Sequence, residues 1–291
     1  MTTATTTPSS GSIFGGVWWR HVLAWVAIVW ALFPIVFIAS AAVNPAGSLS
    51  TSSLLPNAFS WANFQTLFSS PTWPYLSWYK NSLYVATVGS VATLFIGACS
   101  AYVFSRMRFK GRRAGLMTLL LLQMFPALLA FVAVYATFDQ IGQVLPAIGL
   151  DTTSGLILAY LGGAMGANVW LLKGYFDTVP KELDEAAKID GASHARVFFT
   201  IVLPLVVPIL VTVFMLSFVG LFSEFMLASI FLRDVNQQTL GVGLWALQAA
   251  DKNAYFGQFC AGALLASLPV VAIYLGLQKQ LIGGLTSGSV K

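Results

Sequence analysis

The chain has 291 residues, of which 57% are hydrophobic and only 9% are charged, and its formal net charge is +5. Soluble domains are about 45–50% apolar and about 25% charged, so this composition excludes an ordinary water-soluble protein. The apolar residues form long continuous runs, whereas the strands of a membrane β-barrel would read as short alternating segments. Only helices and closed barrels pair every backbone N–H and C=O group inside lipid, and a barrel does not fit these runs. The sequence therefore predicts an all-α, polytopic membrane protein.

The first 16 residues are rich in Thr and Ser, and we expect them to form a disordered cytoplasmic N-terminus. Six apolar runs follow, and each is long enough to cross a bilayer core, which takes about 20 helical residues. They cover residues 17–43, 78–104, 116–138, 154–172, 203–232 and 259–277. The sequence therefore predicts one domain of six transmembrane helices over residues 17–282, with a short cytoplasmic tail at 283–291.

The Lys and Arg residues are divided unequally between the two sides of these runs. Twelve of the 15 lie in the segments on one side, and three (Lys80, Arg233 and Lys252) lie on the other. Cytoplasmic loops carry the excess of basic residues, so the net charge indicates topology and not nucleic-acid binding. The distribution of Lys and Arg places both termini and a loop at about 174–202 in the cytoplasm, and a loop at about 233–258 outside.

The cytoplasmic loop before the fifth run contains the stretch EAAKIDGASHARVFFTIVLP, from Glu185 to Pro204. We expect Pro180 at the first helical position, followed by carboxylates that suit the positive end of a helix. Gly191 would end that helix with a positive φ, and Ser193 would cap the next one. The residues predict a short amphipathic helix, a glycine corner and a second helix. By themselves they favour equally a docking surface for a protein partner and a loop lying on lipid.

The spacing of this stretch resembles the signature of permease subunits in binding-protein-dependent ABC importers. Glu185, Ala186 and Ala187 are followed by Gly191 after three residues, and by Ile201, Leu203 and Pro204 after nine more. The stretches VWLLKGYFDTVPKELDEAAKIDGAS, FLRDVNQQTLGVG and GLTSGSVK are similar to those of the smaller permease subunit of maltose/maltodextrin importers. This closer similarity covers about residues 156–291.

The resemblance implies a type I ABC importer permease fold in the bacterial cytoplasmic membrane. The partners would be a second permease subunit, two P-loop ATPase subunits that bind ATP and Mg²⁺, and an extracytoplasmic sugar-binding protein. The chain itself has no G-x-x-x-x-G-K-[ST] loop, so it would be neither an enzyme nor the holder of a cofactor. Its cargo would be a di- or oligosaccharide, either maltose/maltodextrin or a related α-glucoside such as trehalose.

The same resemblance implies three contact regions. The first is a coupling helix that docks on the ATPase, represented by Glu185, Ala186, Ala187, Asp190, Gly191, Ile201, Leu203 and Pro204. The second is an outer loop that reaches the binding protein, represented by Leu247, Gln248, Asp251, Lys252, Asn253 and Tyr255. The third is a tail that inserts between the ATPase subunits, represented by Gly284, Leu285, Thr286, Ser287 and Gly288.

Glu224 is the only acid that we expect well inside a predicted span. An ionisable group in the membrane is costly, which suggests a function such as a sugar or proton path. The alternative, which we favour, is a hydrogen-bonded glutamate that pins one helix to another. A proton-coupled secondary transporter using Glu224 is the alternative function, although the sequence lacks the internal repeat common in such proteins. A passive scaffold or channel would leave the docking stretch unexplained. His21 and His194 have no partners at ligand spacing, so we expect no metal site.

Overall fold

The computed structural model describes residues 18–163 and 166–287, and the regular elements in these ranges are all helical. Three helices are individually long and apolar enough to cross a membrane: α1 (Trp18–Val43), α3 (Tyr75–Arg106) and the Phe256–Gln280 part of α14 (Phe256–Ser287). Three bent helix pairs also pass this test, which gives up to six spans. The six predicted apolar runs correspond to these six units.

Each bent pair has a break of a few residues. α4 (Arg112–Met124) and α5 (Ala127–Val144) meet at 100°, and α6 (Thr153–Gly163) and α7 (Ala167–Phe176) meet at 58°. α11 (Val207–Ser223) lies at 83° to the helical segment His194–Leu205 that precedes it. Pro126 lies in the first break, and Pro208 opens α11. Proline has no N–H to continue a helical ladder, so both positions favour a change of direction.

The shorter elements include the three that make up the segment His194–Leu205, and the others connect the six units. They are η1 (Leu49–Thr51), α2 (Ala62–Ser69), η2 (Pro146–Ile148), α8 (Lys181–Ile189), α9 (His194–Val197), the π-helical η3 (Phe198–Val202), α10 (Leu203–Leu205), α12 (Met226–Phe231) and α13 (Leu240–Ala250). The π turn lies just before Pro204, and the Leu203 amide donates to the carbonyl of Phe198, five residues back. Because Pro204 cannot donate to the carbonyl four residues before it, the wider turn is a local consequence of this proline.

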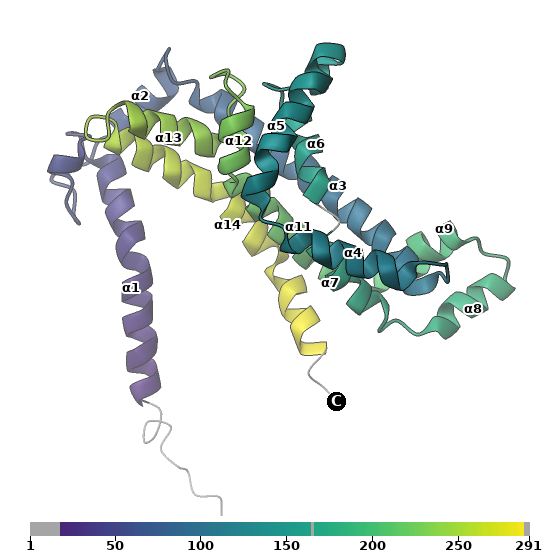
Figure 1. Cartoon of the computed structure of the whole chain (residues 1–291). Coiled ribbons are helices and arrows are strands. Elements are labelled where there is room, and N and C mark those ends of the chain that lie inside the picture. Colours follow the sequence, from purple (N-terminus) through teal and green to yellow (C-terminus); the bar gives the residue numbers. More distant parts are fainter. Residues whose placement is uncertain (1–17, 164–165, 288–291) are drawn as a thin grey trace, which may run out of the picture.

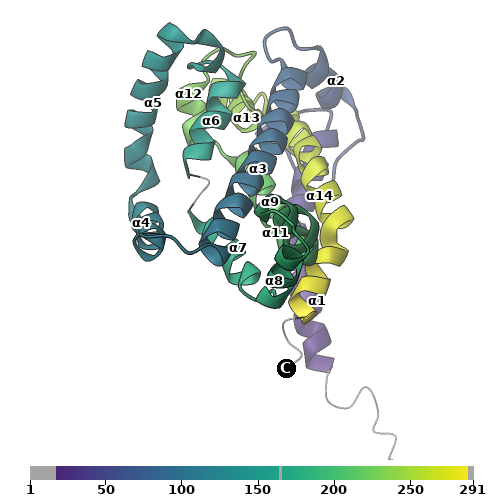
Figure 2. The same ribbon diagram turned by 90° about the vertical axis from the view of Figure 1, so that its right-hand side faces the viewer.

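Helix α3 runs through the centre of the molecule (Figures 1 and 2), where it packs against α11, α7, α6 and α13. One buried cluster surrounds the N-terminal end of α3 at Trp78, and another, the Tyr102 cluster, surrounds its C-terminal end. Trp78 is fully buried against Gly243 of α13, where an added Cβ would lie 2.1 Å from the indole ring. The close approach of α3 and α13 therefore requires a glycine at that position.

Helix α1 extends away from the rest of the chain (Figure 1). Its residues from 18 to 36 are exposed, including Trp25, Trp30 and Phe33, and burial begins only in its last turns, at Ser40 to Ala42. These last turns pack on α14 and α2. The long apolar surface of α1 is suited to lipid or to another subunit.

The fifth predicted span differs from the structure. The sequence predicts one helix over residues 203–232, but the backbone breaks at Glu224 and Phe225, between α11 and α12. At the other end of the chain, α14 continues to Ser287, so Gly284, Leu285, Thr286 and Ser287 belong to its last turns. The predicted N-terminal region 1–16 and the tail residue Gly288 lie outside the described residues.

Candidate functional site

The helix predicted as the docking element is α8, and it begins one residue later than expected. Pro180 has φ −55° and ψ 132°, so it precedes the helix as its N-cap, and the prediction that it occupies the first helical position is wrong. The proline ring fixes φ in either place, and it is the extended ψ that excludes Pro180 from the helix. Glu182 and Asp184 follow in the first turn, where negative charge suits the positive end of the helix.

The corner after α8 has the predicted geometry. Gly191 has a φ of 80°, and its N–H donates to the carbonyl of Lys188 at 3.0 Å. The N–H of Ala192 donates to the carbonyl of Ala187 at 2.9 Å, which completes a Schellman motif. Ser193 caps α9 by accepting a hydrogen bond from the backbone N–H of Arg196 at 3.3 Å. The prediction of a helix, a glycine corner and a second helix is confirmed.

The exposed face of α8 is partly apolar. Leu183 is 42% exposed and Ile189 is 87% exposed, and Ala186 lies between them at helical spacing of three residues. Ala187 is partly buried against the Tyr102 cluster, so Ala186 and Ala187 lie on different faces of α8. Exposed apolar side chains on a charged helix fit contact with a protein partner or with a membrane surface.

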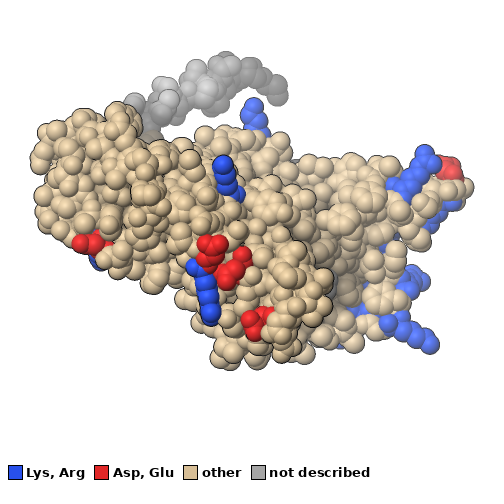
Figure 3. Space-filling model, turned by 90° about the horizontal axis from the view of Figure 1, so that it is seen from above, with Lys and Arg blue, Asp and Glu red and all other residues tan. Residues whose placement is uncertain are grey.

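The other predicted residues of this segment fall into two groups. Glu185, Asp190 and Gly191 are exposed beside the apolar face of α8. Ile201 and Leu203 are partly buried against the Tyr102 cluster, and Pro204 is exposed beside them. Ile201 and Leu203 therefore support the second helix from the inside, and none of these three residues belongs to α8. Figure 3 shows uncharged residues over most of the face seen from above, with Lys and Arg gathered at its right-hand end, where Figure 1 places α8 and α9.

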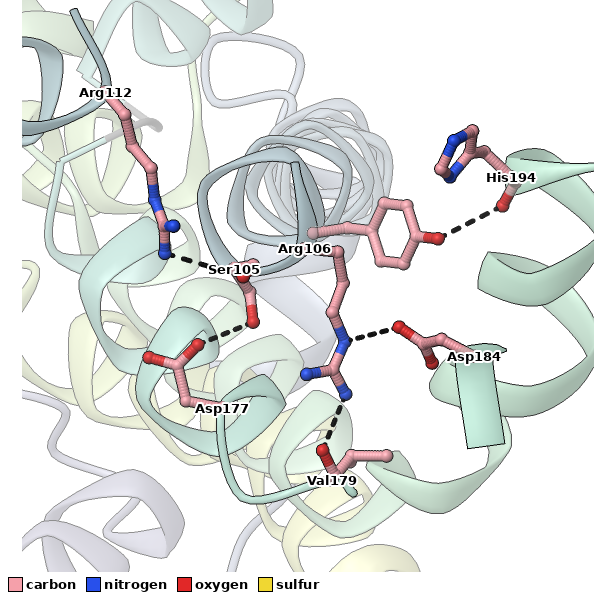
Figure 4. A network of polar contacts seen from close by, with 8 residues as sticks. Ser105, Arg106, Arg112, Asp177, Val179, Asp184 and His194 are labelled. Carbon is pink, nitrogen blue, oxygen red and sulfur yellow. Dashed lines mark hydrogen bonds and ion pairs between the residues drawn. The ribbon is translucent and has the colours of Figure 1, made fainter. Parts of the chain in front are cut away.

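A buried ion pair joins α8 to the C-terminal end of α3 (Figure 4). The distance between Arg106 Nε and Asp184 Oδ2 is 2.9 Å, and the two side chains are only 3% and 7% exposed. The Arg106 Nη2–H also donates to the carbonyl of Val179 at 2.8 Å, just before α8. This pair was not predicted, because nothing in the sequence links two residues 78 positions apart.

Two more side chains of α3 hold neighbouring parts of the same segment (Figure 4). The Tyr102 hydroxyl donates to the carbonyl of His194 at 3.3 Å, and the Ser105 hydroxyl donates to Asp177 Oδ1 at 2.6 Å. Burial raises the pKa of Asp177, but hydrogen bonds from Lys173 and Ser105 outweigh it and hold that pKa below its ordinary value. Asp177 is therefore a charged anchor between α7 and α8.

Glu224 lies at the break after α11, so it is not inside a continuous helix as the predicted fifth span required. Its Oε1 accepts from the N–H of Leu227 at 2.8 Å, and its Oε2 accepts from the N–H of Ala228 at 3.1 Å. The Tyr160 hydroxyl of α6 donates to the same Oε2. The carboxylate therefore satisfies the first amides of α12 and joins that helix to α6, which fits the interpretation of Glu224 as a helix-pinning residue.

The predicted outer loop consists of α13 and the turn after it. Leu247 is fully buried, so it cannot contact a partner, and its inclusion among the contact residues is wrong. Gln248 is half-buried on α13. Tyr255 is half-buried too, and its ring meets Trp73 edge-on at 6.0 Å.

The turn itself is exposed at Asp251, Lys252 and Asn253. The Asp251 carboxylate accepts from the N–H groups of Asn253 and Ala254, both at 2.9 Å. Asn253 Oδ1 accepts from the N–H of Ser50 at 3.0 Å, which ties the turn to the first outer loop. Among the predicted contact residues, Asp251 and Lys252 are exposed and, within the described residues, have no hydrogen bond to the loop that contains Ser50.

Two of the bent-pair breaks, α4–α5 and α6–α7, and the break between α11 and α12 lie around one cavity of about 580 Å³. Gln123 and Phe125 line it beside the α4–α5 break, Gly163 and Gly166 line it beside the α6–α7 break, and Leu227 follows the α11–α12 break. Interrupted helices at membrane depth are tolerated where the free backbone groups are buried in protein or face a hydrated cavity. Among the described residues, no cluster of three or more His, Cys, Asp and Glu could hold a metal ion.

Comparisons with known proteins identify the family. The model of the family described as binding-protein-dependent transport system inner membrane component matches residues 93–283. The maltose/maltodextrin transport system permease protein MalG of Vibrio vulnificus strain YJ016 is 41% identical over 286 residues, covering 94% of this chain and 96% of that protein. The protein of the same name from Escherichia coli K12 is 39% identical over 282 residues, covering 93% and 94%.

Solved structures share the fold. A chain of a bacterial ABC transporter involved in the import of the acidic polysaccharide alginate superposes with a TM-score of 0.76 at 23% identity, covering 95% of this chain and 99% of that one. The alginate transporter in complex with an alginate pentasaccharide-bound periplasmic protein gives 0.64 at 17% identity, covering 90% and 93%. The predicted all-α, type I ABC importer permease fold is confirmed. The chain belongs to the family of binding-protein-dependent transport system inner membrane components.

Proposed function

We propose that this chain is a permease subunit of an ATP-driven importer for maltose/maltodextrin or a related α-glucoside such as trehalose. The observation that carries the proposal is α8, a helix with an exposed apolar face that is held rigidly at the end of an apolar, membrane-spanning body. A helix of this kind fits a cleft on a separate protein. The maltose/maltodextrin permeases that are about 40% identical over nearly the whole chain support the choice of sugar.

In this proposal α8 faces the cytoplasm with both chain termini, as the distribution of Lys and Arg favours. Two P-loop ATPase subunits bind ATP and Mg²⁺ and receive α8, and the tail from Gly284 to Gly288 inserts between them. A second permease subunit completes the path for the sugar. An extracytoplasmic sugar-binding protein docks on the outer side, where Asp251 and Lys252 are exposed.

The cavity beside the α4–α5, α6–α7 and α11–α12 breaks supports a role for this chain in lining the path. Gln123 and the hydroxyl-bearing Tyr160 give its otherwise apolar wall some polar positions. The Glu224 carboxylate accepts three hydrogen bonds and caps the N-terminal end of α12. This arrangement gives the carboxylate a structural role and does not favour a proton carrier.

The test is purification of the tagged chain from native membranes in mild detergent, followed by mass spectrometry. The expected result is a second permease and a P-loop ATPase in about equal amounts, and uptake of maltose that needs ATP and the binding protein after reconstitution. A chain that purifies alone and takes up sugar on a pH gradient without ATP would refute the proposal.

A further inference from the structure

Helix α3 is held by hydrogen bonds at both of its ends. At the outer end, three side chains in the first turns of α3 bind the backbone of the segment that leads into α13. The Trp78 Nε1–H donates to the Val235 carbonyl at 2.7 Å. The Asn81 side-chain amide donates to the carbonyls of Asn236 and Gln238 at 2.8 and 3.0 Å. The Ser82 hydroxyl accepts from the N–H of Leu240 at 2.7 Å. The outer loop is thus fixed to α3.

At the inner end, Tyr102, Ser105 and Arg106 bind the segment that contains α8, as described above. The ion pair of Arg106 with Asp184 has features of a positioning contact more than of a stabilising one. Arg106 Nη1 and Asp184 Oδ1 are buried without hydrogen-bond partners in the described part of the chain. A buried pair with incomplete hydrogen bonding gains little over apolar side chains of similar volume, but it fixes the relative position of its two elements.

Between these ends α3 is one continuous helix of 32 residues, about 48 Å long. Its sequence has no proline, whereas α1 and α14 contain Pro34 and Pro269, and the other three spans are bent. α3 also packs against α6, α7, α11 and α13 along its length (Figure 2). A continuous helix without a proline kink is suited to carry a displacement from one end to the other.

We infer that α3 is the element that transmits docking of the binding protein on the outer loop to the ATPase at α8, and that Arg106 and Asp184 position α8 for this purpose. The inference rests on the proposed function. It predicts that loosening either end of α3 separates the two events: the partners still bind, but the binding protein no longer stimulates ATP hydrolysis.

The inner end is tested with the double variant Arg106→Met, Asp184→Leu, which replaces the pair by apolar side chains. Complexes purified through a tag on this chain are placed in nanodiscs and assayed with and without the copurified binding protein loaded with maltose. We expect the ATPase subunit to copurify in wild-type amounts and the stimulation of hydrolysis to fall about tenfold. Arg108→Ala, which removes an exposed arginine two residues away, is the control and keeps wild-type stimulation. Full stimulation in the double variant, or a fall that only follows loss of bound ATPase, would overturn the inference.

The outer end is tested with Asn81→Ala against Lys80→Ala, its exposed neighbour. We expect about tenfold weaker stimulation in Asn81→Ala, with the maltose-loaded binding protein still captured by the complex. Equal stimulation in the two variants would overturn the role of α3. The wild-type complex tests the proposed function separately: without stimulated hydrolysis there, the function itself is wrong, whereas stimulated wild-type and variant complexes refute only the inference.

Discussion

Replacement of Gly191 by alanine changes the corner after α8 through the backbone alone. A Cβ at this position would meet nothing within 4 Å, so no steric clash contributes. The φ of 80° is left-handed, and an L-residue there costs about 1–2 kcal/mol. A change of that size shifts the equilibrium of the corner by roughly 5- to 30-fold. We expect maltose uptake per ATP hydrolysed by the reconstituted complex to fall, because α8 spends less time in its docking orientation.

Gly111 provides a matched control for this substitution. It has a φ of 88° in the turn before α4, and a Cβ there would also meet nothing within 4 Å. Gly111→Ala therefore carries the same backbone cost outside the docking segment. Asparagine tolerates a left-handed backbone, so Gly191→Asn should retain more coupling than Gly191→Ala, and Gly191→Pro should retain none. Equal coupling in Gly191→Ala and Gly111→Ala, or unchanged transport in Gly191→Pro, would refute the reasoning.

Three further substitutions test the rest of the fold and the site. Glu224→Ala removes the acceptor at the start of α12 and should cost about 1 kcal/mol in stability, seen as a lower thermal midpoint, with ATP-driven uptake retained; a normally folded variant without uptake would contradict this. Gly243→Ala places a Cβ inside a buried indole ring and should prevent accumulation of the protein in membranes, whereas Gly241→Ala on the same helix, with its nearest contact at 3.8 Å, should accumulate normally. Leu247→Ala should destabilise the chain by about 2–5 kcal/mol, and Lys252→Ala should weaken capture of the binding protein without a change in thermal midpoint; the reverse pattern would show that the loop is misassigned.

Local features of the chain could be predicted well from the sequence. The six apolar runs correctly predicted the membrane-spanning helical units, because hydropathy over about 20 residues depends little on tertiary context. The corner at Gly191 and the cap at Ser193 were predictable because each depends on the conformation of one residue and hydrogen bonds to its near neighbours.

Other features depend on contacts between distant residues and could not be predicted. Hydropathy is continuous through Glu224, so the break there is set by donors from α12 and by a tyrosine of α6. Asp184 looked like one more acid at the start of a helix, and its burial follows from the position of Arg106 on α3. Leu247 was placed in a contact loop by resemblance, but α13 turns that side chain into the core.

The exposed part of α1 is constrained mainly by what surrounds the protein. Residues 18–36 are exposed within this chain, so exchanges among apolar side chains there leave its interior packing unchanged. Selection on these positions therefore comes from whatever surrounds the helix. A fluid lipid environment accepts any apolar residue of suitable length, whereas a neighbouring subunit accepts only certain shapes at Trp25, Trp30 and Phe33. A saturation library over this helix, scored by growth on the transported sugar, would outline the face that another protein covers.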